Sequence, residues 1–384
     1  MHLAIDATNI RQGGGVTHLS QLLNVASLKG SGISSVTVWS CDRTLAQLPT
    51  RQWLKKKSCK WIEARLVLRL LGQQLLFNRE ILKNGCDVLF SPGGTIPFLI
   101  KAPVVTMSQN MLPFEPAEAL RFGRWSLMRF KMWLLRQSQS RSFRRADGLV
   151  FLTQYAKTAI SNALGNILKL NSLIPHGIES RFLQPPRPAR KISDCSFETP
   201  FRLLYVSILM PYKHQVEVAL AISHLRKEGW PVEMKFIGPI WGHYGKKFTD
   251  LLDELDPQGK FLQWTGEESF EALHNSYINA EAFVYASSCE NLPNILIEAM
   301  AAGLPIACSN RGPMPEVLGN AGVFFDPESP DSIADTLREL VNNSYLRMSL
   351  AELAWQKAQT YSWERCAKDT FEFIAHVAKH HVRA

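Results

Sequence analysis

The chain has 384 residues, of which 46% are hydrophobic, so it is long enough to bury two cores of ordinary size. Its formal net charge of +9 favours anionic partners such as phosphorylated substrates, membrane surfaces or nucleic acid. Seven scattered cysteines form no CxxC pair, which indicates a reduced cytoplasmic protein without a structural metal. With no charged leader and no apolar run of about 18 residues, we expect neither a classical secretion signal nor a membrane span.

Short apolar runs alternate with longer periodic stretches, which is typical of βαβ units. The strands expected in the first half are 2–5, 35–39, 88–90, 104–106, 148–152 and 172–174. Those expected in the second half are 202–207, 233–238, 261–264, 282–285, 305–308 and 322–325. Residues 183–200 are rich in proline and charge, the composition of an exposed connection. We therefore predict an α/β protein with two doubly wound Rossmann-like domains, 1–182 and 201–360, whose sheets face a shared cleft.

A glycine-rich turn, Gly13-Gly14-Gly15, follows the first predicted strand and leads into a helix. Glycines let the backbone approach a phosphate or sugar closely, and a helix start favours an anion. Three adjacent glycines do not match the GxGxxG dinucleotide fingerprint. A merely flexible loop is the alternative, but the place of this turn after the first strand favours binding.

In the second half, residues 206–214 follow a predicted strand and place Lys213 at the mouth of the expected cleft. A lysine there can neutralise the charge that grows on a departing nucleoside diphosphate. The alternative is an ordinary solvated lysine on the surface.

Two carboxylates, Glu290 and Glu298, lie where the apolar run 282–286 gives way to a helix. We expect Asn291 to cap this helix and Pro293 to lie in its first turn. The helix start would attract a diphosphate, while Glu298, about 10 Å farther along the axis, would accept bonds from two ribose hydroxyls. Glu290 would then face the group that the diphosphate carries. Acids near helix starts are also common for dipole and solubility reasons alone.

These residues, together with 303–308, 311–316 and 322–327, resemble the donor-binding half of the retaining glycosyltransferases of family 4, the glycosyl transferases group 1 proteins of the GT-B fold. The resemblance covers nearly the whole chain, strongly from 287 to 326. It implies metal-independent, cofactor-free hexosyl transfer from a nucleoside diphosphate sugar, with Glu290 and Lys213 as catalytic residues. The donor-binding residues that it implies are Glu298, Gly13, Gly14, Gly15, Ser207, Gly238, Gly266, Asn291, Leu292, Pro293 and Asn294.

The resemblance further implies an acceptor that is lipid-linked or a polysaccharide, in bacterial-type synthesis of lipopolysaccharide or exopolysaccharide. It also implies that the final segment, 361–384, forms a helix that packs back onto the first domain. His176, in a Pro-His-Gly segment, resembles the turn that closes the first domain of the family, although a plain turn is the favoured explanation.

One departure from the family pattern concerns the phosphate. Relatives have a Gly-Arg-Leu stretch where this chain has 207–209, Ser-Ile-Leu, so one cation is missing. Arg202, Lys246 or Arg311 is a candidate to replace it, and backbone N–H groups are another.

A second departure concerns the acceptor, because Ser108-Gln109-Asn110 replaces the His-Asp or His-Asn of relatives. Amides can position a hydroxyl but cannot take its proton at neutral pH, so Gln109 and Asn110 are candidates for acceptor binding only. A plain turn is equally consistent. Retaining transfer tolerates this loss if the leaving phosphate oxygen accepts the proton.

Basic residues cluster with tryptophan in two stretches of the first half, 51–69 and 121–145. Such stretches suit an anionic membrane surface, and we expect peripheral binding at the inner face of the plasma membrane. Nucleic acid is the rival partner and is not expected, since both stretches lie in the domain that would hold the acceptor. A solvated face is the remaining alternative.

Two other classes of function stay open. One is another GT-B enzyme, a nucleotide-sugar epimerase or a phosphorylase. The other is a non-catalytic nucleotide-sugar-binding membrane scaffold, which the two missing motifs make conceivable.

Overall fold

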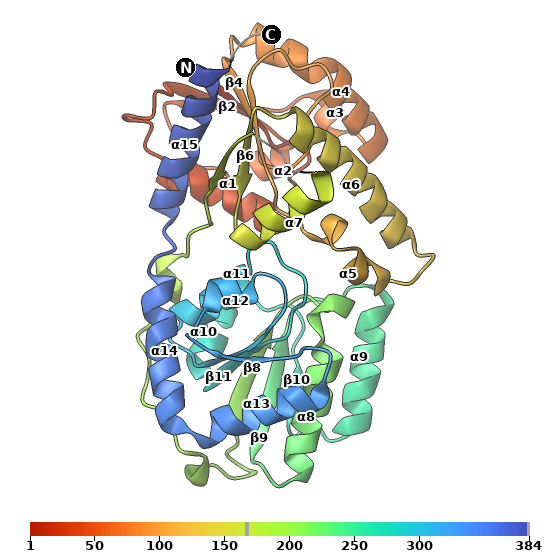
Figure 1. Ribbon diagram of the computed structural model, residues 1–384, viewed down its shortest axis with the longest axis vertical. Helices are drawn as coiled ribbons and strands as arrows, with labels where there is room; N and C mark the ends of the chain where they lie inside the picture. The colour runs from red at the N-terminus through yellow and green to blue at the C-terminus, as the bar shows by residue number, and fades with distance from the viewer. Residues whose placement is uncertain (166–168, 382–384) are drawn as a thin grey trace. The chain divides into compact units, whose positions relative to one another are not determined.

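The computed structural model describes residues 1–165 and 169–381, and the chain divides into two compact units (Figure 1). The first unit comprises Met1–Phe114, Leu127–Gly177 and Ser362–Ala384. The second comprises Glu115–Ser126 and Ile178–Tyr361. The chain therefore leaves the first unit after Gly177, a few residues before the predicted boundary, and the segment predicted as a linker packs within the second unit.

The first unit contains a parallel sheet of seven strands in the order β3-β2-β1-β4-β5-β6-β7. The strands are β1 His2–Asp6, β2 Ser35–Trp39, β3 Leu54–Lys57, β4 Val88–Ser91, β5 Val104–Met107, β6 Gly148–Phe151 and β7 Leu170–Leu173. The six predicted strands are all present, with ends shifted by one or two residues. Strand β3 was not predicted, because three of its four residues are lysines, which suit the edge position that it occupies.

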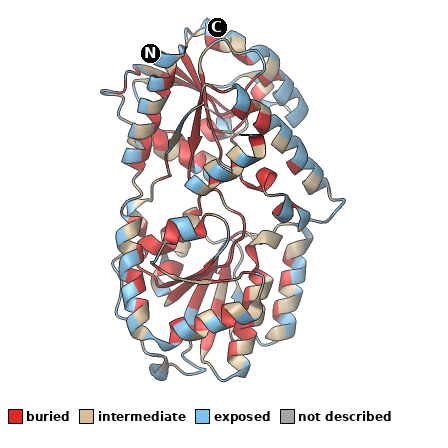
Figure 2. Ribbon diagram, in the orientation of Figure 1, coloured by how far each residue is buried: buried red, intermediate tan, exposed pale blue. Residues whose placement is uncertain are grey.

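Helices cover this sheet, and their inward faces are buried while their outer faces are exposed (Figure 2). They are α1 Gly14–Val25, α2 Asp42–Leu45, α3 Lys60–Glu63, α4 Leu66–Lys83, α6 Leu127–Arg145, α7 Gln154–Leu164 and α15 Trp363–His380. The final helix, α15, packs against α1 and against three of the strands, β4, β5 and β6.

The second unit contains a parallel sheet of six strands in the order β10-β9-β8-β11-β12-β13. The strands are β8 Phe201–Val206, β9 Val232–Ile237, β10 Leu262–Trp264, β11 Ala282–Tyr285, β12 Ile306–Ser309 and β13 Val323–Phe325. The helices are α5 Pro116–Leu120, α8 Gln215–Lys227, α9 Gly242–Leu255, α10 Phe270–Asn279, α11 Asn294–Ala301, α12 Met314–Leu318, α13 Pro330–Asn342 and α14 Ser344–Ala358. All six strands predicted for this half are present.

Both units are doubly wound, as the sequence predicts. In the second sheet the strand order reverses between β8 and β11, which are neighbours in space. Open α/β sheets bind ligands beyond the carboxyl ends of their strands at such a reversal, so the loops after β8 and β11 are the first place to look for a site.

Candidate active site

The loops after β8 and β11 bring Lys213 and Glu290 together. Lys213 ends a 3₁₀ turn, Pro211–Lys213, and only 6% of the residue is exposed. Its ammonium forms an ion pair with the carboxylate of Glu290. Two residues that lie 77 positions apart in the chain thus form one ion pair, with side chains that are 7% and 16% exposed.

A tyrosine joins this pair. The hydroxyl of Tyr285, the last residue of β11, donates a hydrogen bond of 2.6 Å to Glu290. The same oxygen lies 3.4 Å from Nζ of Lys213, which donates to it. Burial raises the pKa of Tyr285 well above its ordinary value, and the charge of Glu290 raises it further, so the phenol remains a neutral donor. We call Lys213, Tyr285 and Glu290 the buried triad.

The two loops that carry the triad are also fastened to each other. The hydroxyl of Tyr205 donates to the backbone carbonyl of Lys213. His214 lies 3.0 Å from the hydroxyl of Ser288, and the Ser288 backbone N–H donates to the carbonyl of Tyr212 at 2.9 Å. The Ser288 hydroxyl also donates to Glu118 at 2.6 Å. These contacts hold Lys213 and Glu290 at a fixed separation without any ligand.

Glu298 lies on α11, where burial governs its ionisation. Burial raises the pKa of its carboxyl to about 7, against the lowering effects of a hydrogen bond from Tyr277 and of the charge of Arg181. At neutral pH this carboxyl is therefore near its midpoint. Ionisation increases the number of hydrogen bonds that a carboxyl group accepts, so the capacity of Glu298 to accept bonds from hydroxyl groups depends on pH.

The helix that carries Glu298 begins later than predicted. Helix α11 starts at Asn294, with Pro293 at the cap position instead of inside the first turn, and Asn291 lies in the preceding loop. Proline has no N–H and disfavours helical geometry in the residue before it, which delays the start. Glu298 therefore lies only about 6 Å along the axis from the first helical residue, not about 10 Å.

Three small residues meet at the carboxyl ends of β8, β9 and β10. Gly238 donates its backbone N–H to the carbonyl of Gly266 at 2.8 Å. Gly238 has a φ of 146°, and a Cβ there would collide with the carbonyl of Ser207. Only glycine permits this approach, which gathers Ser207, Gly238 and Gly266 beside the loop of Lys213.

In the first unit, the glycine turn is mostly helical. Gly13 is the cap residue of α1, with a φ of 68°, whereas Gly14 and Gly15 already belong to its first turn. Gly15 lies against the amide of Gln109. The same amide lies 3.2 Å from Nδ1 of His18, a residue that the sequence analysis did not select.

His18 is buried and its ring stacks on His176 at 4.5 Å. Burial lowers the pKa of His18 well below its ordinary value, and His176 lowers it further, so this imidazole is neutral at pH 7. The side chain of Asn110 accepts a hydrogen bond of 3.1 Å from the backbone of Leu112. For Asn110 the structure thus shows the turn-forming contact that the sequence left as an alternative.

The candidates for the missing phosphate cation occupy different edges of the second sheet. Arg202 lies at the amino end of β8, the end opposite to Lys213, so it cannot serve the same site. Arg311 follows the carboxyl end of β12 and forms an ion pair with Asp326 at 3.2 Å. Lys246 lies on α9, which follows the carboxyl end of β9. Arg311 and Lys246 follow the carboxyl ends of their strands, as Lys213 does, and so remain candidates for the missing cation.

Among the side chains that the structure describes, no group of three or more His, Cys, Asp or Glu residues is arranged to hold a metal ion. Over residues 1–165 and 169–381, no helix has the length and apolar character needed to cross a membrane.

Residues 190–357 match the family Glycosyl transferases group 1. This segment contains the buried triad and Glu298. Together with the two doubly wound units, this match identifies the fold as GT-B, and the resemblance to the group 1 glycosyltransferases is confirmed at that level.

Three similar proteins illustrate the relationship of this GT-B chain to known proteins. The O-antigen chain mannosyltransferase B of Escherichia coli is 31% identical over 44% of this chain and 44% of its own length, so the chain spans less than half of that relative. A GDP-mannose-dependent alpha-(1-6)-phosphatidylinositol monomannoside mannosyltransferase of Mycobacterium tuberculosis is 24% identical over 73% of this chain and 74% of its own. The structure of sucrose-phosphate synthase from Thermosynechococcus elongatus aligns with a TM-score of 0.73 at 14% identity, over 96% of this chain and 97% of its own.

Proposed function

We propose that the protein is a retaining glycosyltransferase that moves a hexose from a nucleoside diphosphate sugar to a lipid-linked or polysaccharide acceptor in bacterial-type synthesis of a cell-surface glycan. The observation that carries the proposal is the buried triad at the reversal point of the second sheet, with Glu298 on the helix that follows. A protein that only scaffolds a membrane has no need of a buried lysine and carboxylate, because burying charges costs free energy.

Each member of the site has a role in this reaction. Lys213 and the N–H groups at the start of α11 offset the charge that develops on the diphosphate. Ionised Glu298 accepts bonds from the ribose hydroxyls, and Glu290 from the hydroxyls of the hexose. Since Lys213 is paired with Glu290, an entering diphosphate takes part of that ammonium's bonding, and Tyr285 keeps Glu290 in place.

The chemical step breaks the bond between the anomeric carbon and the phosphate oxygen, and the electron pair leaves with the phosphate. The acceptor hydroxyl oxygen bonds to the same face of that carbon and passes its proton to the departing phosphate oxygen. This route needs no protein base, which agrees with an amide at Gln109 and with a buried His18 whose lowered pKa makes it a weak base. No metal is required where cationic and helix-start groups carry the phosphate charge.

The relatives support the choice of substrates. The names of the two mannosyltransferases specify an O-antigen chain and a phosphatidylinositol monomannoside as the molecules acted on, and one specifies GDP-mannose as donor. By analogy, the acceptor of this protein is a glycan carried on a lipid, and its donor is a nucleoside diphosphate hexose.

We also propose peripheral binding to an anionic membrane. The residues that support it in the structure differ in part from those expected from the sequence. Of the stretch 51–69, Trp61 packs against Phe77 at 6.2 Å, and Lys56 and Lys57 bond to Leu48 and Asn84. That stretch is thus a strand, a short helix and the first residues of α4, not one amphipathic surface. The exposed apolar residues lie on α4, at the end of the stretch and beyond it: Leu66, Val67, Leu68, Leu70, Leu71, Leu75, Leu76 and Leu82.

This apolar face of α4 continues onto its neighbours within the first unit. Gln74 of α4 accepts a hydrogen bond of 2.6 Å from the backbone of Phe98, whose ring lies 3.6 Å from the guanidinium of Arg141 on α6. Helix α6 exposes Leu127, Phe130, Trp133 and Leu134 among its many cations. Exposed leucines and aromatic rings beside cations suit the inner, anionic leaflet of a plasma membrane, a cytoplasmic location.

Helix α4 also contacts the loop that precedes α1. Gln73 donates to the buried carboxylate of Asp6 at 2.6 Å, and Arg69 donates to Asn9 at 3.1 Å. Helix α4 therefore connects the membrane face to the loop that ends at Gly13, a residue that we propose binds the donor.

The test is to incubate the purified protein with a panel of nucleotide sugars, with and without a membrane lipid extract, and to measure the nucleoside diphosphate released. Release that depends on lipid supports the proposal. Conversion of the donor without acceptor would indicate an epimerase, and a requirement for free phosphate would indicate a phosphorylase. If no donor yields nucleoside diphosphate and Glu298→Ala leaves nucleotide binding unchanged, the proposal is wrong.

A further inference from the structure

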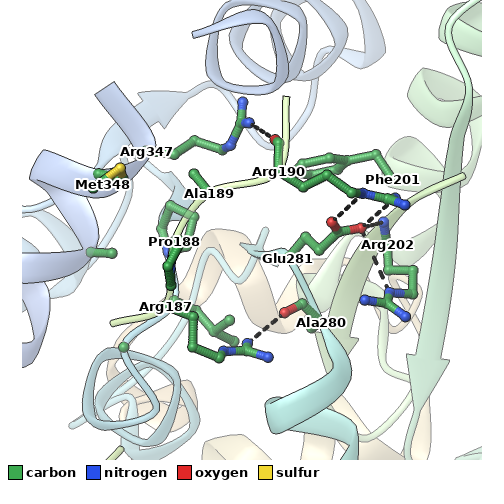
Figure 3. A pocket seen from close by; sticks show the side chains of 14 residues that line it. Arg187, Pro188, Ala189, Arg190, Phe201, Arg202, Ala280, Glu281, Arg347 and Met348 are labelled. Atoms are coloured by element: carbon green, nitrogen blue, oxygen red, sulfur yellow. Dashed lines mark hydrogen bonds and ion pairs between the residues drawn. The ribbon is translucent and has the colours of Figure 1, made fainter. Parts of the chain in front are cut away.

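A cavity of about 280 Å³ lies in the second unit at the amino ends of the strands (Figure 3). Its lining includes Phe201, which begins β8, Glu281, which precedes β11, and Pro305, which precedes β12. The strands are parallel, so this edge is opposite to the one that carries Lys213 and Glu290. The six residues of β8 separate the two edges by about 20 Å.

Four guanidinium groups line the cavity, those of Arg187, Arg190, Arg202 and Arg347, while Glu281 is the only acid among the described residues that do so. Arg190 and Arg202 both approach Glu281, at 2.8 Å and 3.6 Å. Arg187 donates to the carbonyls of residues 278 and 280, and Arg347 donates to those of residues 190, 340 and 341. The cavity lining thus combines four cations with one carboxylate, and only two of the cations are paired with that carboxylate.

Burial shifts the ionisation of groups around the cavity. Glu233 lies opposite Arg202 in the strand register, and burial raises its pKa, against the lowering effect of the charge of Arg202. Burial lowers the pKa of Arg187, and the charge of Arg202 lowers it further. Burial also lowers the pKa of Arg347, against the raising effect of the charge of Glu281. These arginines are thus partly withdrawn from water, where an anionic ligand would stabilise their charged form.

The arginines retain donors for a ligand. Each guanidinium has five N–H groups. The side chain of Arg202 is 50% exposed, and its described contact to Glu281 uses only Nε. Guanidinium groups match the oxygens of a phosphoryl group in pairs, and a dianion would offset the excess charge. The apolar side of the cavity, Phe201, Leu304 and Met348, has room for a small organic body.

We propose that this cavity is a second ligand site, which binds a small phosphate monoester at the edge of the sheet remote from the donor. The ligand's phosphoryl group lies between Arg187 and Arg202, and its body lies against Met348 and Phe201. Because residues 187–190 form one wall, binding also holds this segment against the sheet. This second site does not depend on the proposed transferase reaction, and the experiments below test it separately.

The test titrates the full-length protein with glycerol 3-phosphate by calorimetry, at constant ionic strength. Hydrogen exchange locates the ligand, and we expect protection of residues 187–190 and 278–281. Vesicles that contain phosphatidic acid form a second arm, which distinguishes a lipid headgroup from a free monoester. Protection of the cavity by vesicles alone would overturn the assignment to a small ligand.

Three variants sharpen the result. Arg202→Gln and Arg187→Gln, both at exposed residues, should each weaken binding at least tenfold. Glu281→Gln should tighten binding several-fold, because the substitution removes the carboxylate that competes for the cations while keeping an oxygen acceptor. If these residues had a purely structural role, this variant would show no gain in affinity. The matched control is Arg338→Gln, which removes an ion-paired arginine of the same unit. Equal weakening in the control, protection confined to the loops after β8 and β11, or no binding at millimolar ligand would each overturn the proposal.

Discussion

The hydroxyl of Tyr277 lies 3.1 Å from a carboxylate oxygen of Glu298 and donates a hydrogen bond to it. Tyr277 is fully buried and packs edge-on against Phe182 at 5.7 Å. The tyrosine thus presents a fixed donor to a carboxyl whose pKa burial has raised to about 7. The two opposing effects place the ionisation of Glu298 in the range where enzymes of neutral compartments work.

The first prediction concerns donor binding and pH. Protonated Glu298 loses acceptor capacity, so the affinity for a nucleoside diphosphate should rise severalfold between pH 6 and pH 8. Calorimetric titration across this range measures it. Glu298→Gln should bind more weakly at pH 8 and show little of the pH dependence. An unchanged pH profile in the variant would exclude Glu298 as the titrating group.

The second prediction concerns stability. The unfolded carboxyl titrates near its ordinary value of 4.5 and the folded one near 7, so the folded protein binds the extra proton between these values. The stabilising contribution of the protonated group is complete below pH 4.5 and is lost as pH rises through 7. The free energy of unfolding of Glu298→Gln minus that of wild type should therefore be higher at pH 8 than at pH 4.5, by about 1 to 3 kcal/mol. Urea denaturation at both pH values measures the difference, and equal effects at both would contradict the pKa.

The third prediction follows from the hydrogen bond of Tyr277. This bond lowers the pKa of Glu298, so Tyr277→Phe should move the midpoint of donor binding to higher pH. The loss of a buried donor should also cost about 1 kcal/mol in the free energy of unfolding. The binding titration described above gives the midpoint. A midpoint that falls or stays in place would show that Tyr277 does not favour the charged form.

The fourth prediction tests the buried triad. Tyr285→Phe removes the hydroxyl that donates to Glu290 and accepts from Lys213, while the ring still fills its place. We expect kcat to fall by about tenfold to a hundredfold with little change in KM, since a hydrogen bond to a charged group contributes about 1.5 to 3 kcal/mol. The control is Tyr345→Phe at a residue that is 87% exposed. Wild-type kcat in Tyr285→Phe would remove the tyrosine from the mechanism.

The fifth prediction tests the membrane face of α4. The double substitution Leu68→Glu and Leu71→Glu places two acids among residues that are 60% and 51% exposed. Flotation with vesicles of phosphatidylglycerol should fall at least tenfold, because apolar burial is lost and like charges repel. Leu173→Glu, at a 43% exposed residue of β7, is the matched control. Equal flotation of all three proteins would place the membrane contact elsewhere.

Strands were predicted well where buried runs are apolar, as in β4 and β11, all of whose residues are buried. Strand β3 was not predicted because its lysines, at an edge of the sheet, leave no apolar signal in the sequence. The start of α11 was misplaced because Asn291 and Pro293 fit more than one position near a helix start, and only the folded loop distinguishes these. His18 and Tyr285 were missed for a similar reason, since a histidine in a helix and a tyrosine in an apolar strand carry no motif.

The sequence by itself determined the two doubly wound sheets, the place of Lys213 and Glu290 after their strands, and the family of the second unit, because these follow from local periodicity and short motifs. Only the tertiary structure decided that Tyr285 joins Lys213 to Glu290, that burial brings Glu298 to a pKa of about 7, and that four arginines and one glutamate line a cavity at the opposite edge. These relationships depend on the distance and burial of side chains far apart in the chain. Such quantities arise only when the strands are placed side by side.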